Sequence, residues 1–298
     1  MEKFSKVVVT RLEERDVIGG EISIVKVRKN NGLILTGINV AKLNGVSPTV
    51  YINWFFEDYK DGKDIDEICE IIETTYSEGD RFKDNELKDL SEFENIKDNI
   101  VFKLVNYDMN KELLEEVAHT RFGDLVLVYM MVIEVKNEEL GSALIRKSLL
   151  EIWNIGIDDI EKIAKKNTER MFKPYFKSMV NTISEILEVN ELEIENLPGC
   201  GMWVLGNEQK IFGASVVVYD DLLQKISDEL NDDLIILPSS VHEVLILKAS
   251  ENIDGVGELE EMVKSININE VDREEVLSNN VYFYDRHEDL FSIIKASK

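Results

Sequence analysis

Apolar and polar positions follow two different rhythms near the start of the chain. Apolar residues recur every third or fourth position over residues 4–16, which predicts a helix. The stretch EISIVKVR at residues 21–28 alternates with a period of two and predicts a strand. The sequence NNG at residues 30–32 tolerates positive φ, so we expect a hairpin that returns over residues 33–38.

The same periods predict strands and helices up to residue 147. An extended piece over residues 49–53 precedes an aromatic run, and Asp64 stands where a helix N-cap is expected. Residues 78–98 are polar and are expected to form a surface excursion. Further strands are predicted over residues 100–105, 125–135 and 141–145, and helices over residues 64–76 and 110–117.

Beyond residue 147 the period becomes helical and then mixed again. Residues 148–188 keep a helical period, and we interpret residues 148–197 as a helical bridge. The last third of the chain combines both periods. Strands are predicted over residues 202–205, 214–219, 234–237, 244–247 and 281–284, with helices after Asp220 and over residues 259–266.

These elements predict an α+β fold of two lobes. Each lobe is expected to hold a mixed β-sheet with packed helices, and the helical segment joins the lobes. The length of 298 residues also favours two lobes. The predicted boundaries are residues 1–147 for the first lobe, 148–197 for the bridge and 198–298 for the second lobe.

Composition and charge narrow the classes of function. Hydrophobic residues make up 44% of the chain and charged residues 31%, which is typical of a globular protein and not of a disordered acidic tail. The net charge of −25 disfavours direct contact with nucleic acid or with an anionic membrane. Such acidity fits a basic partner, a mimic of DNA or a solvated surface. The 34 basic residues interleave with the acids, which favours the solvated surface.

The cysteines and the chain start bear on localisation. Cys69 falls at an apolar helical position and Cys200 in a Pro-Gly-Cys-Gly turn, so the pair suits neither a disulfide framework nor a zinc site. The charged first residues lack the apolar core of a signal peptide. The longest apolar run, residues 125–133, is too short to span a membrane and predicts a buried strand. We therefore expect a cytoplasmic protein.

Known catalytic motifs offer no anchor. The chain contains no GxGxxG, GxxxxGK[ST], HExxH or GxSxG pattern, which are typical of nucleotide, zinc-protease and serine-hydrolase sites. It contains three histidines, which limits both metal sites and general bases. The sequence therefore predicts no cofactor and no metal ion.

The strongest catalytic candidates lie in the loop PSSVHE at residues 238–243. Ser239 or Ser240 could act as a nucleophile, with His242 as its base and Glu243 as the orienting carboxylate. Neighbours in sequence rarely point toward one another, however. The alternative is a tight hairpin loop whose Ser and His side chains bond the backbone, and we favour this interpretation.

A second cluster, HTRFGD, immediately precedes the long apolar run. Its candidates are His119, Arg121 and Asp124, which could face the first loop across a cleft. Glu115 lies four residues before His119, and a shared helical face would suit metal ligation. The alternative, which we favour, is a helix-end hydrogen bond for His119 and an ion pair between Arg121 and Asp124.

An aromatic run gives a candidate interaction surface. Exposed aromatic residues are typical of binding hot spots, whereas buried ones pack under a sheet. Burial in the core is the better interpretation for most such runs. The residues are Tyr51, Trp54, Phe55, Phe56 and Tyr59.

Six segments of the chain are informative when taken together. They are VRKNNGLILTGINV, GVSPTVYINWFFEDYKDG, NKELLEEVAHTRFGDLVLVYMMV, MWVLGNEQKIFGASVVVYDDLL, DDLIILPSSVHEVLILKA and EEVLSNNVYFYD. In matching order they resemble a bacterial family described as domain of unknown function 5688. The resemblance spans residues 20–285 and is strongest at LPSSVHEVLIL and SPTVYINWFFEDYKDG. It implies a bacterial cytoplasmic protein and transfers no catalytic residue.

Three hypotheses of function follow from these observations. The leading one is a non-enzymatic binding or regulatory protein that contacts a partner protein, for instance an inhibitor or decoy in conflict between bacteria and mobile elements. The first alternative is a hydrolase or transferase that uses the Ser/His/Glu loop. The second alternative is a structural subunit of a homo-oligomer.

Overall fold

The computed structural model describes residues 1–16, 18–41, 49–79, 92–136, 139–187, 201–238 and 240–296. The chain divides into an N-terminal unit, Met1–Asn95, and a C-terminal unit, Ile96–Lys298, and each is treated by itself. Every strand pair that the structure describes is antiparallel. The predicted α+β class is confirmed, whereas the expected mixed sheets are antiparallel among the described strands. No helix in the described ranges is both long and apolar enough to cross a membrane.

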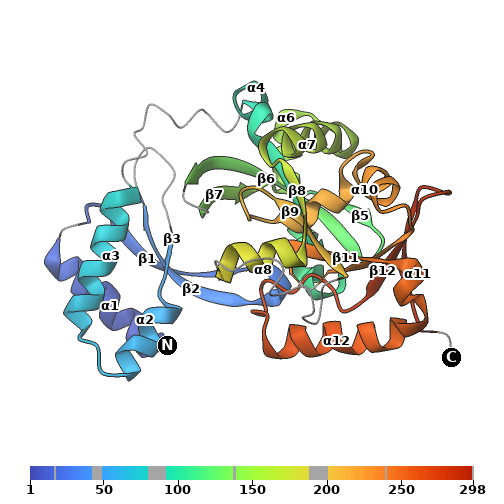
Figure 1. The fold of residues 1–298 in the computed structure, drawn as a ribbon. Helices are drawn as coiled ribbons and strands as arrows, with labels where there is room; N and C mark the ends of the chain where they lie inside the picture. Colours follow the sequence, from blue (N-terminus) through green and yellow to red (C-terminus); the bar gives the residue numbers. More distant parts are fainter. Residues whose placement is uncertain are drawn as a thin grey trace. The chain divides into compact units, whose positions relative to one another are not determined.

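The N-terminal unit contains a sheet in the order β1-β2-β3 (Figure 1). The strands are β1 (Glu21–Arg28), β2 (Ile34–Ala41) and β3 (Thr49–Tyr51). Asn31 has φ 55° and Gly32 has φ 69° in the turn η1 (Asn30–Gly32), which is the backbone that the NNG sequence predicts. The predicted hairpin is therefore confirmed.

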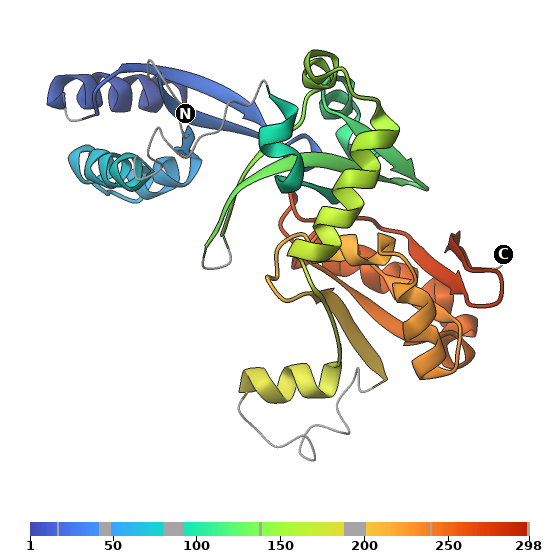
Figure 2. The same ribbon diagram turned by 90° about the horizontal axis from the view of Figure 1, so that it is seen from above.

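Three helices pack on one face of this sheet (Figure 2) in the described part of the N-terminal unit. They are α1 (Glu2–Arg15), α2 (Asn53–Lys60) and α3 (Ile65–Gly79). Asp64 accepts a hydrogen bond from the Asp66 amide at 2.7 Å, so it caps α3 as predicted. Cys69 is fully buried among aliphatic side chains, and this burial raises the pKa of its thiol to about 11. Cys200 lies outside the described residues.

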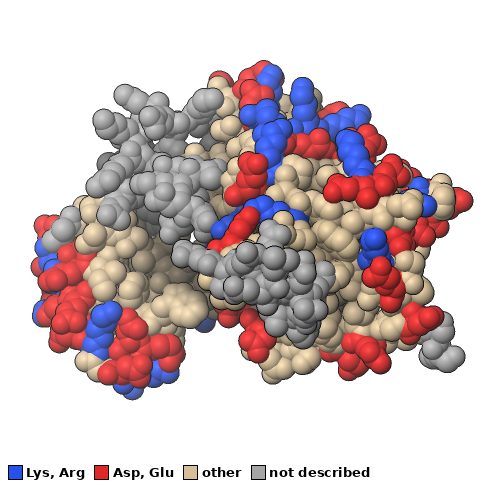
Figure 3. Space-filling model, viewed as in Figure 1, with Lys and Arg blue, Asp and Glu red and all other residues tan. Residues whose placement is uncertain are grey.

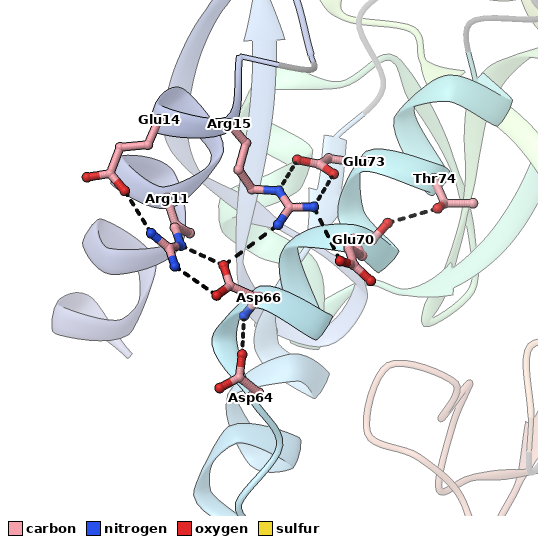
Figure 4. A network of polar contacts seen from close by, with 8 residues as sticks. All are labelled: Arg11, Glu14, Arg15, Asp64, Asp66, Glu70, Glu73 and Thr74. Carbon is pink, nitrogen blue, oxygen red and sulfur yellow. Dashed lines mark hydrogen bonds and ion pairs between the residues drawn. The ribbon is translucent and has the colours of Figure 1, made fainter.

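Paired charges join α1 to α3 along their exposed edge (Figure 4). Arg11 Nη2 donates to Asp66 Oδ2 at 2.8 Å, and Arg15 Nε donates to Glu73 Oε1 at 2.7 Å. Both guanidinium groups engage two oxygens of one carboxylate, which fixes the geometry of the two helices better than single contacts would. The hydrogen bond from Arg11 lowers the pKa of the Asp66 carboxyl.

The aromatic run was expected to be buried in the core, and only part of it packs there: Phe55 and Phe56 are partly buried against the core. Most of it forms α2, in which no residue is buried. Trp54 is 69% exposed and Tyr59 is 46% exposed. Phe4 contacts the rings of Phe56 and Tyr59, so α2 faces α1 through that side. Because α2 is helical, Trp54 points away from this contact.

The C-terminal unit contains two sheets in its described part. The large sheet has the strand order β13-β12-β10-β11-β9-β8, and the small sheet has the order β4-β6-β5, with β7 also paired to β6. In the large sheet, from β8 to β13, the bounds are Pro174–Ser178, Met202–Asn207, Leu234–Leu237, Glu243–Lys248, Val281–Asp285 and Leu290–Ile294. In the small sheet, from β4 to β7, they are Ile100–Asn106, His119–Phe122, Leu125–Lys136 and Glu139–Leu144.

Helices cover both sheets. The helix α7 (Ile157–Met171) packs on the small sheet, and α12 (Val256–Asn269) covers one face of the large sheet (Figures 1 and 2). The shorter helices are α4 (Phe93–Ile96), η2 (Lys97–Asn99), η3 (Asp108–Asn110), α5 (Lys111–Glu116), α6 (Lys147–Trp153), α8 (Met179–Leu187), η4 (Gly213–Val218), α10 (Leu222–Leu230), α11 (Ala249–Asn252) and η5 (Ile253–Gly255).

The outer edge of β4 is closed by side chains from later in the chain. The Phe102 amide donates to Thr168 Oγ1 of α7 at 3.1 Å, and the Leu104 amide donates to Ser215 Oγ of η4 at 3.2 Å. Thr168 and Ser215 are both 2% exposed. These hydroxyl groups satisfy amides that would otherwise lack a partner in the protein interior.

The structure divides the chain after Asn95, whereas the expected boundaries follow residues 147 and 197. The contacts of β4 account for this difference. Residues 100–144 form the small sheet, which hydrogen-bonds and packs with α7 and η4 instead of completing the first lobe. The expected helical bridge also contains β8, which pairs with β9. The polar stretch at residues 80–91 lies outside the described residues.

One predicted strand is wrong. Residues 214–219 were expected to be extended, but they form the 3₁₀ helix η4. Phe212 has φ 49° just before it, which turns the chain out of an extended path. A Cβ on Gly213 would lie 2.2 Å from the His242 carbonyl oxygen, so a glycine is required where these backbones meet. A short apolar run alone does not distinguish a strand from a buried helix.

Replacement of Arg11 by Met should destabilise the N-terminal unit in a pH-dependent manner. The folded-state pKa of Asp66 lies below its usual value of 3.8, so the stabilisation is present above that value and is lost as pH falls through the folded-state pKa. We expect Arg11→Met to lower the unfolding temperature at pH 7 and to have little effect in strong acid. Thermal unfolding at both pH values, with Lys6→Met as an exposed control, measures this difference. An equal effect of Arg11→Met at both pH values would contradict it.

Tyr76→Phe should change the alkaline stability of the same unit. The Tyr76 hydroxyl donates to the Ile38 carbonyl, and burial raises its pKa from 10.0 to about 12. The stabilisation is therefore complete below pH 10 and is lost as pH rises through 12. We expect Tyr76→Phe to lower the free energy of unfolding by about 1–3 kcal/mol at pH 7 and to flatten the alkaline decline. Urea unfolding over this range tests both effects, and Tyr59→Phe, at an exposed ring, should show neither.

Candidate functional site

The predicted catalytic loop joins β10 to β11 and forms a local backbone turn. Ser239 lies outside the described residues. Ser240 Oγ accepts a hydrogen bond from the His242 amide at 2.8 Å. Ser240 also pairs with Val276 in an isolated antiparallel bridge. The Ser240 hydroxyl therefore holds the turn, which agrees with the hairpin-loop interpretation.

The imidazole of His242 contacts two other segments, residues 210–212 and Glu275. Its Nδ1 donates to the Lys210 carbonyl at 3.1 Å, and its Nε2 lies 3.4 Å from Glu275 Oε1. The ring stacks on Phe212 at 5.9 Å between centroids, with 12° between the planes. Among the described residues, no contact joins the Ser240 hydroxyl to the His242 ring. A serine nucleophile and its base need such a contact.

Glu243 begins β11 and is exposed at the surface of the large sheet. The Tyr175 hydroxyl of β8 donates to Glu243 Oε2 at 3.2 Å. Burial, and then the charge of Glu243, raise the pKa of Tyr175 to about 12. Glu243 thus contacts a neutral tyrosine across β9, and this contact does not orient His242.

His119 does not share a helical face with Glu115. The helix α5 ends at Glu116, and His119 begins β5, so the shared helical face that would suit metal ligation is not present. His119 Nδ1 donates to the Val117 carbonyl at 2.9 Å. Arg121 lies 3.6 Å above the Tyr107 ring instead of pairing with Asp124. Within the described ranges, no group of three or more His, Cys, Asp or Glu side chains could hold a metal ion.

Asp124 accepts three side-chain hydrogen bonds. The hydroxyl of Ser278 and the amide of Asn280 donate to Oδ2 at 3.0 and 2.7 Å. The Tyr282 hydroxyl donates to Oδ1 at 2.9 Å. Tyr282 is 1% exposed, and burial together with the Asp124 charge raises the pKa of its hydroxyl well above the usual range. The carboxylate therefore fastens the β5–β6 turn of the small sheet to β12 of the large sheet.

Both predicted clusters contact one segment, residues 275–282. His242 faces Glu275 there, and Asp124 binds Ser278 and its neighbours. The backbone confirms the first contact, because the Val241 amide donates to the Glu275 carbonyl at 2.8 Å. The structure thus brings each cluster to this segment, whereas no described contact joins His119 to His242. The catalytic assignment of these residues stays a prediction.

A cavity of about 480 Å³ lies beside this segment, at the C-terminal end of α12. Its apolar lining comes from Met109, Ile268, Val271 and Val276. Ile268 is 81% exposed and Met109 is 37% exposed, so apolar surface continues from the cavity onto the outside of the protein. A volume of this size suits a small molecule or one to three side chains of a partner.

Asn267 supports one wall of the cavity and is 8% exposed. Its Nδ2 donates to the Ser278 carbonyl at 2.9 Å and to Asn279 Oδ1 at 2.7 Å. Its Oδ1 is buried without a hydrogen-bond partner among the described residues. Sequence reasoning missed this group, although three polar residues, Ser278-Asn279-Asn280, immediately precede the apolar strand β12.

Fold and site together define an antiparallel α+β protein whose polar clusters fasten two sheets beside a partly apolar surface cavity. The chain belongs to a family of unknown function, DUF5688, whose family model matches residues 1–286. This confirms the resemblance drawn from the sequence segments. Comparison with curated proteins and with solved structures gave no match.

Asp124→Asn should destabilise the C-terminal unit without a large change in shape. The substitution replaces one acceptor oxygen by an NH₂ group, which then faces Asn280 Nδ2 or the Tyr282 hydroxyl. We expect the free energy of unfolding to fall by about 1–3 kcal/mol, since a buried donor loses its acceptor. Urea unfolding of the full chain measures this. Asp254→Asn removes the same charge at an exposed position and should cost less than about 0.5 kcal/mol. Equal losses of unfolding free energy in the two variants would mean that the effect at Asp124 comes from the change in net charge and not from its hydrogen bonds.

Proposed function

We propose that the chain is a bacterial cytoplasmic binding protein that acts through contact with a partner protein and without catalysis. The observation that carries the proposal is the cavity at the end of α12, with Ile268 81% exposed on its lining. An isoleucine side chain this exposed does not stabilise the fold by burial. A partner that covers it removes apolar surface from water, which contributes favourable binding free energy.

The apolar lining suits one bulky side chain of a partner. Met109 is adaptable in shape, and Val271 and Val276 supply fixed walls. Interfaces obtain most of their binding energy from a few anchors of this kind, seated in preformed pockets. The occupant we propose is therefore an apolar residue within an extended protein segment.

The polar residues of the cavity lining can bind the backbone of the partner segment and a basic residue next to its apolar anchor. Asn269 and Asn279 are exposed amides at the cavity, and amides can donate to and accept from a peptide backbone. Glu270 and Asp272 add carboxylates at the C-terminal end of α12, where the helix dipole also favours positive charge. Arg273, a cation of the lining, already has an interaction partner. A lysine or arginine beside the anchor complements this rim.

The contacts of the catalytic candidates support a non-catalytic role. The His242 ring contacts the Lys210 carbonyl, Glu275 and the face of Phe212. Asp124 accepts hydrogen bonds from three neighbours at one carboxylate. Side chains held in this way have fixed partners within the protein, which suits fastening better than proton transfer.

A peptide-display selection against the full chain tests the proposal. We expect enriched peptides with one bulky apolar residue next to lysine or arginine. Binding of a synthetic enriched peptide, measured by calorimetry, should weaken at least about tenfold in Ile268→Asp, equivalent to about 1.4 kcal/mol.

Ile152→Asp provides the matched control. Ile152 is 63% exposed on α6, so the substitution adds the same charge at a comparable apolar surface position away from the cavity. It should leave the affinity within about twofold. Selection without enrichment, or peptides that bind Ile268→Asp as tightly as the unsubstituted chain, would refute the cavity as a docking site.

A further inference from the structure

Trp54 is the most exposed large aromatic side chain among the described residues of the N-terminal unit. Its indole is 69% exposed in the chain, and the N-terminal unit alone exposes it at least as much. The neighbouring aromatic residues of α2 have a partner, because Phe56 and Tyr59 contact Phe4 of α1. Trp54 therefore lies outside the packing that holds α2 to the unit.

Carboxylates share the exposed side of α2 with Trp54. Asp58 lies four residues after Trp54 and Asp61 seven residues after it, which places all three on one helical face. Figure 3 shows carboxylates gathered at the end of the N-terminal unit where Figure 1 places α2. At about 1.5 Å per residue, Asp61 lies roughly 10 Å along the helix axis from Trp54.

The positive charges near this face are bound weakly. Lys63 pairs with Asp58 at 2.8 Å, and the two side chains are 34% and 47% exposed. Lys60 pairs with Glu57 and lies 5.2 Å above the Phe56 ring, on the other side of the helix. Exposed pairs of this kind contribute little, so a partner's cation can replace them at low cost. Asp61 has no ion pair among the described residues.

We infer that this face of α2, formed by Trp54, Asp58 and Asp61, is an interaction surface for an arginine-bearing segment of a partner protein. A guanidinium stacks on the indole face, and a second basic residue reaches Asp61. In a polyproline II segment, which has three residues per turn, residues three apart lie on the same side and are separated by about 9 Å, close to the distance along α2. The segment therefore carries arginine at positions i and i+3.

The surface is separate from the cavity at the end of α12, because the two lie in different units of the chain. Its chemistry also differs. The cavity accepts an apolar anchor, whereas the α2 face offers one aromatic plane flanked by carboxylates. Failure of the cavity proposal would consequently leave this inference intact, and the reverse also holds.

Titration of the full chain with synthetic peptides tests the inference. The probe is a short proline-rich peptide of polyproline II conformation with arginine at positions i and i+3, and its comparison peptides carry lysine or uncharged citrulline there. We expect the indole N–H signal of Trp54, assigned with Trp54→Phe, to shift in nuclear magnetic resonance spectra. The arginine peptide should bind tighter than the lysine peptide, and the citrulline peptide should not bind.

Two variants separate the surface from the general acidity of the chain. Trp54→Ala should weaken binding at least fivefold, and Asp58→Asn with Asp61→Asn at least tenfold. Glu258→Gln with Glu261→Gln is the matched control, because these exposed residues of α12 have the same i, i+3 spacing. This control should change the affinity less than twofold. Equal weakening by both double variants, or a shift of another tryptophan's indole signal without one at Trp54, would overturn the inference.

Discussion

The three hydrogen bonds to the Asp124 carboxylate are the contact on which the organisation of the C-terminal unit depends. They join the β5–β6 turn to the start of β12, and thus join two sheets that share no ladder among the described strands. Tyr282, a residue of β12, is buried. Without the carboxylate its hydroxyl would be removed from water and would lack a hydrogen-bond acceptor. Residues 275–280 are consequently held at a fixed place, and the cavity beside them has a fixed wall.

Two of the catalytic candidates, Asp124 and His242, contact the segment of residues 275–282. His242 contacts Glu275 at the start of this segment, and it also contacts Lys210 and Phe212. A polar group with every partner inside the protein makes a structure rigid, and a rigid wall is what a preformed docking cavity needs. The structural roles of these side chains and the proposed binding role of the adjacent cavity are therefore compatible parts of one arrangement.

Local patterns in the sequence correctly predicted those features of the fold that depend on interactions between residues close in the chain. The NNG turn, the Asp64 cap and the alternating strands follow from φ preferences, side-chain capping and periodicity within a few residues. The contacts that define the site follow from no such pattern, because Asp124 and its partners are 154 to 158 residues apart. Trp54 was placed in the core because its neighbours are aromatic, and only the helical rotation of α2 shows that it points outward. The strand predicted over residues 214–219 failed for a related reason, since Gly213 allows a close backbone approach to the distant His242.

Charge connects the two proposed surfaces to the composition of the chain. A net charge of −25 creates a negative potential around the whole protein, which steers basic segments toward it and accelerates their encounter in a salt-dependent manner. Such a field has little selectivity, because it attracts any cation. Selectivity requires short-range features that a basic segment meets only after the encounter, and the structure offers them where carboxylates adjoin exposed apolar or aromatic groups, at Ile268 and at Trp54. The acidic surface and the proposed binding sites are thus compatible. The net charge acts on a basic segment at long range, and the carboxylates beside Ile268 and Trp54 act on it at short range.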